Sequence, residues 1–191
     1  VFGQPTVRLL GTKLGITAGL RYEHAVRSIS RNRYYTINGV RYAINDPLLG
    51  SMASPYSGVY DEEADFDSLL PRFMLDYRIT PSVMIYTSVA LGYKAGGFST
   101  IANNPDLSGY DPEYAWTYEI GLKSRFLDDR LMVNLSGFFT DVEDYQDRVV
   151  VDNVVTMKNA AKARIYGAEA ELRSRPLPGL DITASLGVLE A

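Results

Sequence analysis

The chain has 191 residues, which fits about one domain, and its net charge of −4 at pH 7 gives no support to a nucleic-acid partner. It contains no cysteine and a single histidine, so disulfides, thiol nucleophiles and a histidine-based metal site are excluded. A hydrophobic content of 46% and a mean hydropathy of −0.09 suit a soluble β-domain, or a membrane β-barrel with a polar interior.

Alternation of apolar and polar residues predicts an all-β, antiparallel fold of about eight strands, because successive side chains of a strand point to opposite faces. The first strand, near 1–10, is poorly patterned. The clearer runs span 14–23, 69–78, 83–98, 113–126, 131–140 and 181–188. Segment 158–175 is rich in helix formers. Its own alternation, and its place before a Pro-x-Pro-Gly turn, favour a strand.

The run 83–98 is the most informative of these strands. Val83, Ile85 and Val89 fall on one side, whereas Tyr86, Ser88 and small residues fall on the other. Only about 9 to 11 tilted residues are needed to cross a bilayer, so this strand is long enough. We therefore expect a transmembrane β-barrel whose apolar face points toward lipid.

The connections between strands alternate in length. Tight links are expected at 11–13, 80–82, 127–129 and 176–179, and long loops at 31–67, 96–112 and 147–157. Short turns at one end and long loops at the other are typical of outer-membrane barrels. Acidic residues in the first long loop are expected to form a solvated loop face rather than a calcium site, since the EF-hand pattern is absent. These residues are Asp61, Glu62, Glu63, Asp65 and Asp67.

The same alternation assigns side chains to the two faces. Tyr118 and Ile120 should face outward, whereas Glu119 and Lys123 should face inward. Aromatic residues near the ends of the outward band are expected at the level of the lipid headgroups. The candidates are Tyr22, Tyr77, Tyr93, Tyr114 and Trp116.

Segments 92–98, 111–146 and 159–172, in this order, resemble the barrel of a TonB-dependent outer-membrane receptor. The resemblance implies a 22-stranded barrel filled by an N-terminal plug. It also implies active import across the bacterial outer membrane, energised through TonB, most often of a ferric siderophore. We expect residues 1–191 to be part of such a barrel domain, cut from a longer protein and lacking the plug.

Two groups of side chains are candidate sites. Tyrosines with arginines in loop 31–67 suit a flat or anionic ligand. These ligand candidates are Tyr34, Tyr35, Tyr42, Tyr56, Tyr60, Arg31, Arg33 and Arg41. The resemblance implies that inward glutamates contact plug arginines, although they could instead be solvated groups of the lumen. The candidates for plug contact are Glu119, Glu169, Glu171, Lys123 and Arg125.

Three alternatives remain open. The chain could be a passive porin or a small stand-alone barrel, since eight strands can close. It could be a soluble all-β binding module. A barrel enzyme is the weakest reading, because His24 has no evident serine partner and no pattern fixes the distance between Glu119 and Glu169. We expect no catalytic residue, metal or cofactor; the expected partners are TonB through the plug, a small nutrient ligand and outer-membrane lipid.

Overall fold

The computed structural model describes residues 1–53, 59–102, 105–151 and 154–191. Almost all of the described chain is β-strand, with two short 3₁₀ turns, η1 (Pro47–Met52) and η2 (Pro105–Leu107). The strands are β1 (Phe2–Gly3), β2 (Thr6–Leu9), β3 (Leu14–Asn32), β4 (Tyr34–Ile37), β5 (Val40–Ala43), β6 (Val59–Thr80), β7 (Val83–Lys94), β8 (Gly97–Phe98), β9 (Gly109–Tyr110), β10 (Glu113–Phe126), β11 (Leu131–Val151), β12 (Val154–Leu177) and β13 (Leu180–Glu190). Within the described ranges, no helix has the length and apolar character to cross a membrane.

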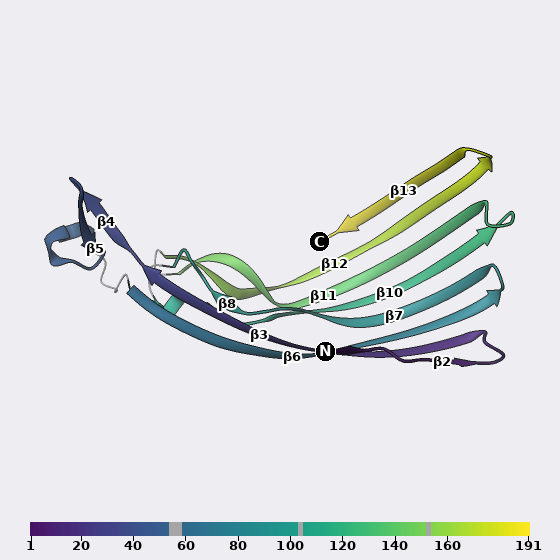
Figure 1. Ribbon diagram of the computed structural model, residues 1–191, viewed down its shortest axis with the longest axis horizontal. Helices are drawn as coiled ribbons and strands as arrows, with labels where there is room; N and C mark the ends of the chain where they lie inside the picture. The colour runs from purple at the N-terminus through teal and green to yellow at the C-terminus, as the bar shows by residue number, and fades with distance from the viewer. Residues whose placement is uncertain (54–58, 103–104, 152–153) are drawn as a thin grey trace.

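Nine of these strands form one antiparallel sheet, in the order β1-β3-β6-β7-β10-β11-β12-β13 with β2 also on β3 (Figure 1). Because β1 and β2 both pair with β3, the sheet has eight positions across its width. The small pairs β4–β5 and β8–β9 lie outside it. The prediction of an all-β, antiparallel sheet of about eight strands is confirmed.

The sheet is a long, curved wall with different ends (Figure 1). The tight turns that join β2 to β3, β6 to β7, β10 to β11 and β12 to β13 all lie at one end, and β4, β5 and β8 lie at the other. We call these the turn end and the loop end. Gly179 in the last turn has φ of 82°, a left-handed conformation that glycine adopts without strain.

The two faces of the sheet differ as the alternation predicts. Lys123 Nζ lies 5.2 Å from the centre of the Tyr86 ring, and the Tyr86 hydroxyl donates a hydrogen bond to Glu119. Tyr118 points the other way, with its ring 6.3 Å from that of Phe139. The predicted register is therefore confirmed. We call the face that carries Glu119 the inner face and the face that carries Tyr118 the outer face.

Apolar side chains of the outer face remain exposed, as lipid contact requires. In β3, Gly15, Thr17 and Gly19 of the inner face are buried, whereas Ile16 and Leu20 of the outer face are exposed. An apolar face of this kind, covering a whole sheet, would be costly in water and is favourable against lipid.

Segment 158–175 lies within β12, so the strand prediction is confirmed. Two loop predictions are wrong. Segment 31–67 contains the end of β3 and the first residues of β6, which begins at Val59. Segment 147–157 contains the end of β11 and the beginning of β12. The acidic residues therefore lie on strand β6 rather than on a loop. Asp61, Glu63 and Asp65 alternate there on the outer face with less exposed residues.

The five predicted belt residues all lie on the outer face. Tyr77 is near the turn end of β6, whereas Tyr22 is part-way up β3 toward the loop end. Tyr93 and Tyr114 are direct partners at the loop end of β7 and β10, with ring centres 5.5 Å apart. Trp116 follows two residues along β10. Their depth relative to the lipid headgroups stays a prediction.

Candidate functional site

A polar trough of about 450 Å³ crosses the inner face between β7 and β13. The trough follows one row of cross-strand backbone partners. In strand order, this row consists of Tyr86, Gly121, Ser136, Glu169 and Gly187. Ser136, which lies in this row next to Glu169, and Gly187 on its other side line the trough with small residues.

Tyr86 and Lys123 form one side of this inner-wall trough, and Glu119 is joined to it through Tyr86. The ring of Tyr86 extends over Gly121, where a side chain would collide with it, and its hydroxyl donates to Glu119. The Lys123 ammonium lies over the same ring. One aromatic side chain therefore holds a carboxylate and a cation in place, which is a common use of a ring with a polar tip.

Two further carboxylates stand on the other side of the trough. Glu171 accepts hydrogen bonds from Asn134 Nδ2 at 3.0 Å and from Arg173 Nε at 2.7 Å. Glu169 is exposed, and no hydrogen bond or ion pair of its carboxylate is found within the described part of the chain. Glu169 is thus the carboxylate with most capacity to bind another group.

Four of the five predicted plug-contact residues gather at this trough. Glu169, Glu171 and Lys123 line it, and Glu119 is joined to it through Tyr86. Arg125 does not belong to the group, because it lies near the turn end and pairs with Asp129 at 3.5 Å. Whether the four contact a plug stays a prediction.

The ligand candidates at the loop end separate into two groups. Tyr34 and Tyr35 lie on β4, and Arg41 and Tyr42 lie on β5. The Arg41 guanidinium lies 4.3 Å from the centre of the Tyr34 ring, and Tyr35 is the backbone partner of Tyr42. This small hairpin presents stacked, partly exposed aromatic and cationic groups, which suit a flat or anionic molecule.

Arg31 and Arg33 instead bind the chain itself. Arg31 donates to the carbonyl oxygens of Thr100 and Ala102, and Arg33 Nη2 donates to Thr100 O at 2.9 Å. Both arginines thus contact segment 95–112. Tyr60 lies on β6, opposite Arg31 in the backbone register. Tyr56 lies outside the described residues.

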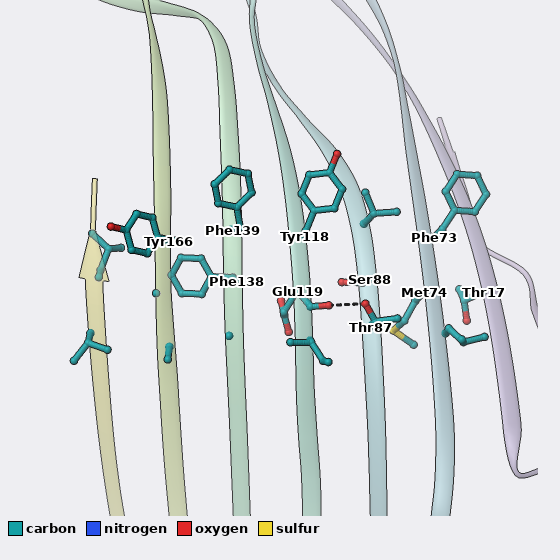
Figure 2. Close-up of a pocket in the computed structure, with 18 of the residues that line it drawn as sticks. Thr17, Phe73, Met74, Thr87, Ser88, Tyr118, Glu119, Phe138, Phe139 and Tyr166 are labelled. Atoms are coloured by element: carbon teal, nitrogen blue, oxygen red, sulfur yellow. Dashed lines mark hydrogen bonds between the residues drawn. The ribbon is translucent and has the colours of Figure 1, made fainter.

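The outer face carries an open apolar groove of about 1000 Å³. Figure 2 shows the rings of Phe73, Tyr118, Phe139 and Tyr166, from β6, β10, β11 and β12, in a row, and these residues share one level of the backbone register. Because the groove lies on the apolar face, it belongs to the surface expected to contact lipid. We therefore place the ligand path on the inner face and at the loop end.

Comparison with known proteins identifies the family. The family model described as TonB dependent receptor-like, beta-barrel matches residues 1–189. The chain belongs to the TonB-dependent receptor family. Barrels of these receptors lie in the bacterial outer membrane, so the outer face of this wall faces lipid. This membership also confirms the resemblance seen in segments 92–98, 111–146 and 159–172.

Individual relatives of this TonB-dependent receptor chain are named as receptors rather than enzymes. A pesticin receptor of Yersinia pestis is 30% identical over 131 residues, which are 68% of this chain and 19% of the relative. A probable TonB-dependent siderophore receptor, PiuA of Acinetobacter baumannii, is 28% identical over 159 residues, covering 80% of this chain and 21% of the relative. The chain thus spans about a fifth of the length of these curated relatives.

Solved structures show the same fold. The ferric yersiniabactin uptake receptor FyuA of Yersinia pestis matches 99% of this chain and 26% of its own, with a TM-score of 0.71 and 22% identity. The ferric-catecholate import receptor Fiu of E. coli K12, in its closed form, matches 100% of this chain and 27% of its own, with a TM-score of 0.64 and 18% identity. At these identities the likeness extends to the fold alone.

Sequence reasoning missed several residues of the inner-wall trough. Alternation placed Tyr86 on the inner face, but nothing local indicated that it would reach Glu119, 33 positions away in sequence. Asn134 and Arg173 were likewise missed as partners of Glu171. The signal that could have found Tyr86 is the pairing of an aromatic residue with a glycine on the next strand, once the register is known.

In the described part of the chain, no group of three or more acidic, histidine or cysteine side chains could hold a metal ion.

Proposed function

We propose that this chain is part of the barrel wall of an outer-membrane receptor that imports a scarce nutrient, a ferric siderophore complex, by active transport energised through TonB. Residues 1–191 would supply about eight strands of the barrel, and other parts of the protein would supply the remaining strands and the plug. The names of the pesticin, PiuA and yersiniabactin receptors support an iron-complex ligand. Members of the family bind siderophore or haem ligands and TonB.

The inner-wall trough is the observation that carries the proposal for a plugged receptor. A plug inside the barrel needs bonds strong enough to position it and weak enough to release. Charge-assisted hydrogen bonds in a wet interior have this character. Glu169, with its exposed carboxylate, is the group best placed to accept one from a plug arginine, with Glu119 on the opposite side of the trough, bound to Tyr86.

The β4–β5 hairpin supports ligand capture at the loop end. Arg41 and Tyr34 form a cation–aromatic pair, and Tyr35 and Tyr42 lie opposite each other on the same hairpin. Arginine with tyrosine can bind the negative charge of an iron complex and the flat rings of its chelating groups. We therefore assign first contact with the ligand to Tyr34, Tyr35, Arg41 and Tyr42.

Transport assays in cells test this proposal. Cells that lack their own iron-complex receptors and express the full-length protein should take up radiolabelled iron from at least one of a panel of ferric catecholate, phenolate and hydroxamate complexes. A matched strain without TonB should show no such uptake. Passage of small solutes at equal rates with and without TonB would instead support the alternative, a passive porin or small barrel.

A further inference from the structure

Residues 95–102 and 105–112, the described parts of segment 95–112, fill a gap in the wall at the loop end. β7 and β10, which this segment connects, stop short of their neighbours. The β3–β6 ladder continues to Asn32 and Val59, and the β11–β12 ladder continues to Val151 and Val154. Between these two longer hairpins, the segment forms the small β8–β9 pair and the turn η2. It contacts both sides, because β8 meets β3 and β9 meets β12.

Gln146 of β11 joins both ends of this segment. Its side-chain nitrogen donates to Ala95 O at 3.0 Å and to Lys94 O at 3.4 Å at the start, and to Asp111 O at 3.0 Å at the end. The side chain is 5% exposed. A buried amide that closes the neck of a loop in this way fixes both of its ends relative to one strand.

Asn159 of β12 makes a second attachment beside it. Its side-chain oxygen accepts from the backbone N–H of Asp111 at 2.7 Å, and its nitrogen donates to Asp111 O at 2.9 Å and to Asp144 O at 2.8 Å. Asp111 thus pairs with this one side chain through both of its backbone groups. Gln146 and Asn159 together bind the segment to the β11–β12 hairpin.

Nearer the start of β12, two side chains bind the middle of the segment. Thr156 Oγ1 donates to Leu107 O at 2.6 Å, and Lys158 Nζ donates to Gly109 O at 3.0 Å. On the opposite side, Ser108 Oγ donates to Glu62 Oε2 of β6 at 3.1 Å. Ser108 and Thr156 are fully buried, which marks this region as densely packed.

Close packing also restricts the segment near β6. A side chain at Gly96 would lie 2.6 Å from both the Phe66 ring and the Tyr110 carbonyl oxygen. Ala102 has no exposed surface, and its carbonyl oxygen accepts from Arg31. Many buried contacts and few exposed backbone bonds are the features that make a segment locally stable.

We propose that Gln146 and Asn159 are positioning residues that hold segment 95–112 as a fixed strut, and that this strut carries the base of the β4–β5 hairpin. The connection to the hairpin runs through Arg31 and Arg33, which donate to Thr100 and Ala102 of the strut and immediately precede β4. The ligand-contacting hairpin is then held in place by two side chains that do not touch it.

A fixed base lowers the entropic cost of ligand binding, because fewer backbone and side-chain freedoms are lost when the ligand arrives. This part of the inference rests on the proposed function, since it assumes that the hairpin contacts the ligand. The proposal that segment 95–112 is a fixed strut does not depend on the proposed function. Loosening the strut should weaken ligand affinity without affecting the later, TonB-driven step.

The test uses the full-length receptor in lipid, with any cysteines elsewhere in the protein replaced, since this chain contains none. A spin label is placed at Ile101→Cys on the strut or, separately, at Ser30→Cys near the end of β3. Both positions are exposed. The double variant Gln146→Glu/Asn159→Asp keeps the size of both side chains and removes their amide donors. Glu143→Gln, on an exposed residue of the same strand, is the matched control.

In the double variant, the electron paramagnetic resonance spectrum of the spin label should contain a mobile component at both label positions. In wild type and in the control, the spectra should show only slow motion of the label. For any ferric complex that wild type imports from the panel above, the apparent KM should rise roughly tenfold with little change in the maximal rate. Slow motion at position 101 in the double variant would overturn the strut. Increased motion with an unchanged KM would overturn the positioning role. If wild type imports no complex, the proposed function fails, and the label at position 101 still decides whether the strut exists.

Discussion

The ring of Tyr86 lies over Gly121 of the neighbouring strand, and its hydroxyl group donates a hydrogen bond to Glu119. The glycine is needed there because a Cβ atom would collide with the ring. We expect Gly121→Ala to displace Tyr86 and to lower the free energy of unfolding by about 1–3 kcal/mol, the usual cost of overpacking. Urea unfolding of the full-length receptor in lipid vesicles measures this change.

Gly137, on the outer face of the next strand, offers a control for the effect of adding a methyl group where there is room for it. A Cβ atom there meets only the Gly167 carbonyl oxygen, at an ordinary contact distance of 3.8 Å. Gly137→Ala should therefore change the free energy of unfolding by no more than about 0.5 kcal/mol. Equal effects of the two substitutions would show that the Tyr86 ring has room to move.

A second prediction concerns an ion pair near the turn end. Arg8 of β2 reaches across Gly15 to Asp76 of β6, with Nη1 2.7 Å from the carboxylate, and Asp76 is 2% exposed. Arg8→Ala leaves this buried carboxylate without its charged donor. We expect a loss of about 1.5–3 kcal/mol, the range for hydrogen bonds to charged groups. Arg78→Ala, at an exposed arginine of β6, should cost much less in the same unfolding assay.

A third prediction tests the two faces. Phe139 lies on the outer face of β11 and is 38% exposed, and in the backbone register it is midway between the levels of Tyr77 and Tyr93. Ser136 lies on the inner face beside the trough. Phe139→Arg should destabilise the barrel by about 2–4 kcal/mol, because arginine near the bilayer midplane is poorly solvated. Ser136→Arg should reduce the stability of the barrel much less. Equal losses in a lipid-based folding assay would mean that the two faces meet the same environment.

Alternation predicted the faces correctly where one of them contacts lipid. The outward Tyr118 and the inward Glu119 are assigned by a period of two alone, since lipid demands apolar side chains at every second position. Beyond the bilayer this demand ends. In the loop-end part of β6, the outer face carries the exposed Asp61, Glu63 and Asp65, so this part of the strand has no apolar side and its sequence predicts a loop.

Cross-strand partners could not be predicted in the same way. Gln146 contacts residues at both ends of segment 95–112, and those contacts depend on a register shift near Tyr145 that no local pattern specifies. The residue type of Arg31 and its position in the expected loop predict a ligand contact, because both suit an anion. Its contacts with Thr100 and Ala102 follow from how far β3 extends, which the sequence pattern did not indicate.

The fourth prediction concerns the inner-wall carboxylates. In the full-length protein, Glu119→Gln/Glu169→Gln should leave barrel assembly intact, because both side chains lie on the inner face and the lipid-facing surface is unchanged. Each charge-assisted hydrogen bond lost to a plug arginine should weaken plug docking by about 1.5–3 kcal/mol. A loosened plug should admit large antibiotics that wild-type cells exclude, and should alter the uptake of iron complexes.

Antibiotic susceptibility and iron uptake, measured on the same cells, check this prediction. Glu143→Gln is the control, because Glu143 is an exposed carboxylate that pairs with Lys162 at 3.3 Å, away from the trough. It should behave as wild type in both assays. A double variant that also behaves as wild type would make Glu119 and Glu169 solvated groups of the lumen. An effect from Glu169→Gln alone would agree with the structure, in which Glu119 already has Tyr86 as a donor and Glu169 is exposed on the other side of the trough.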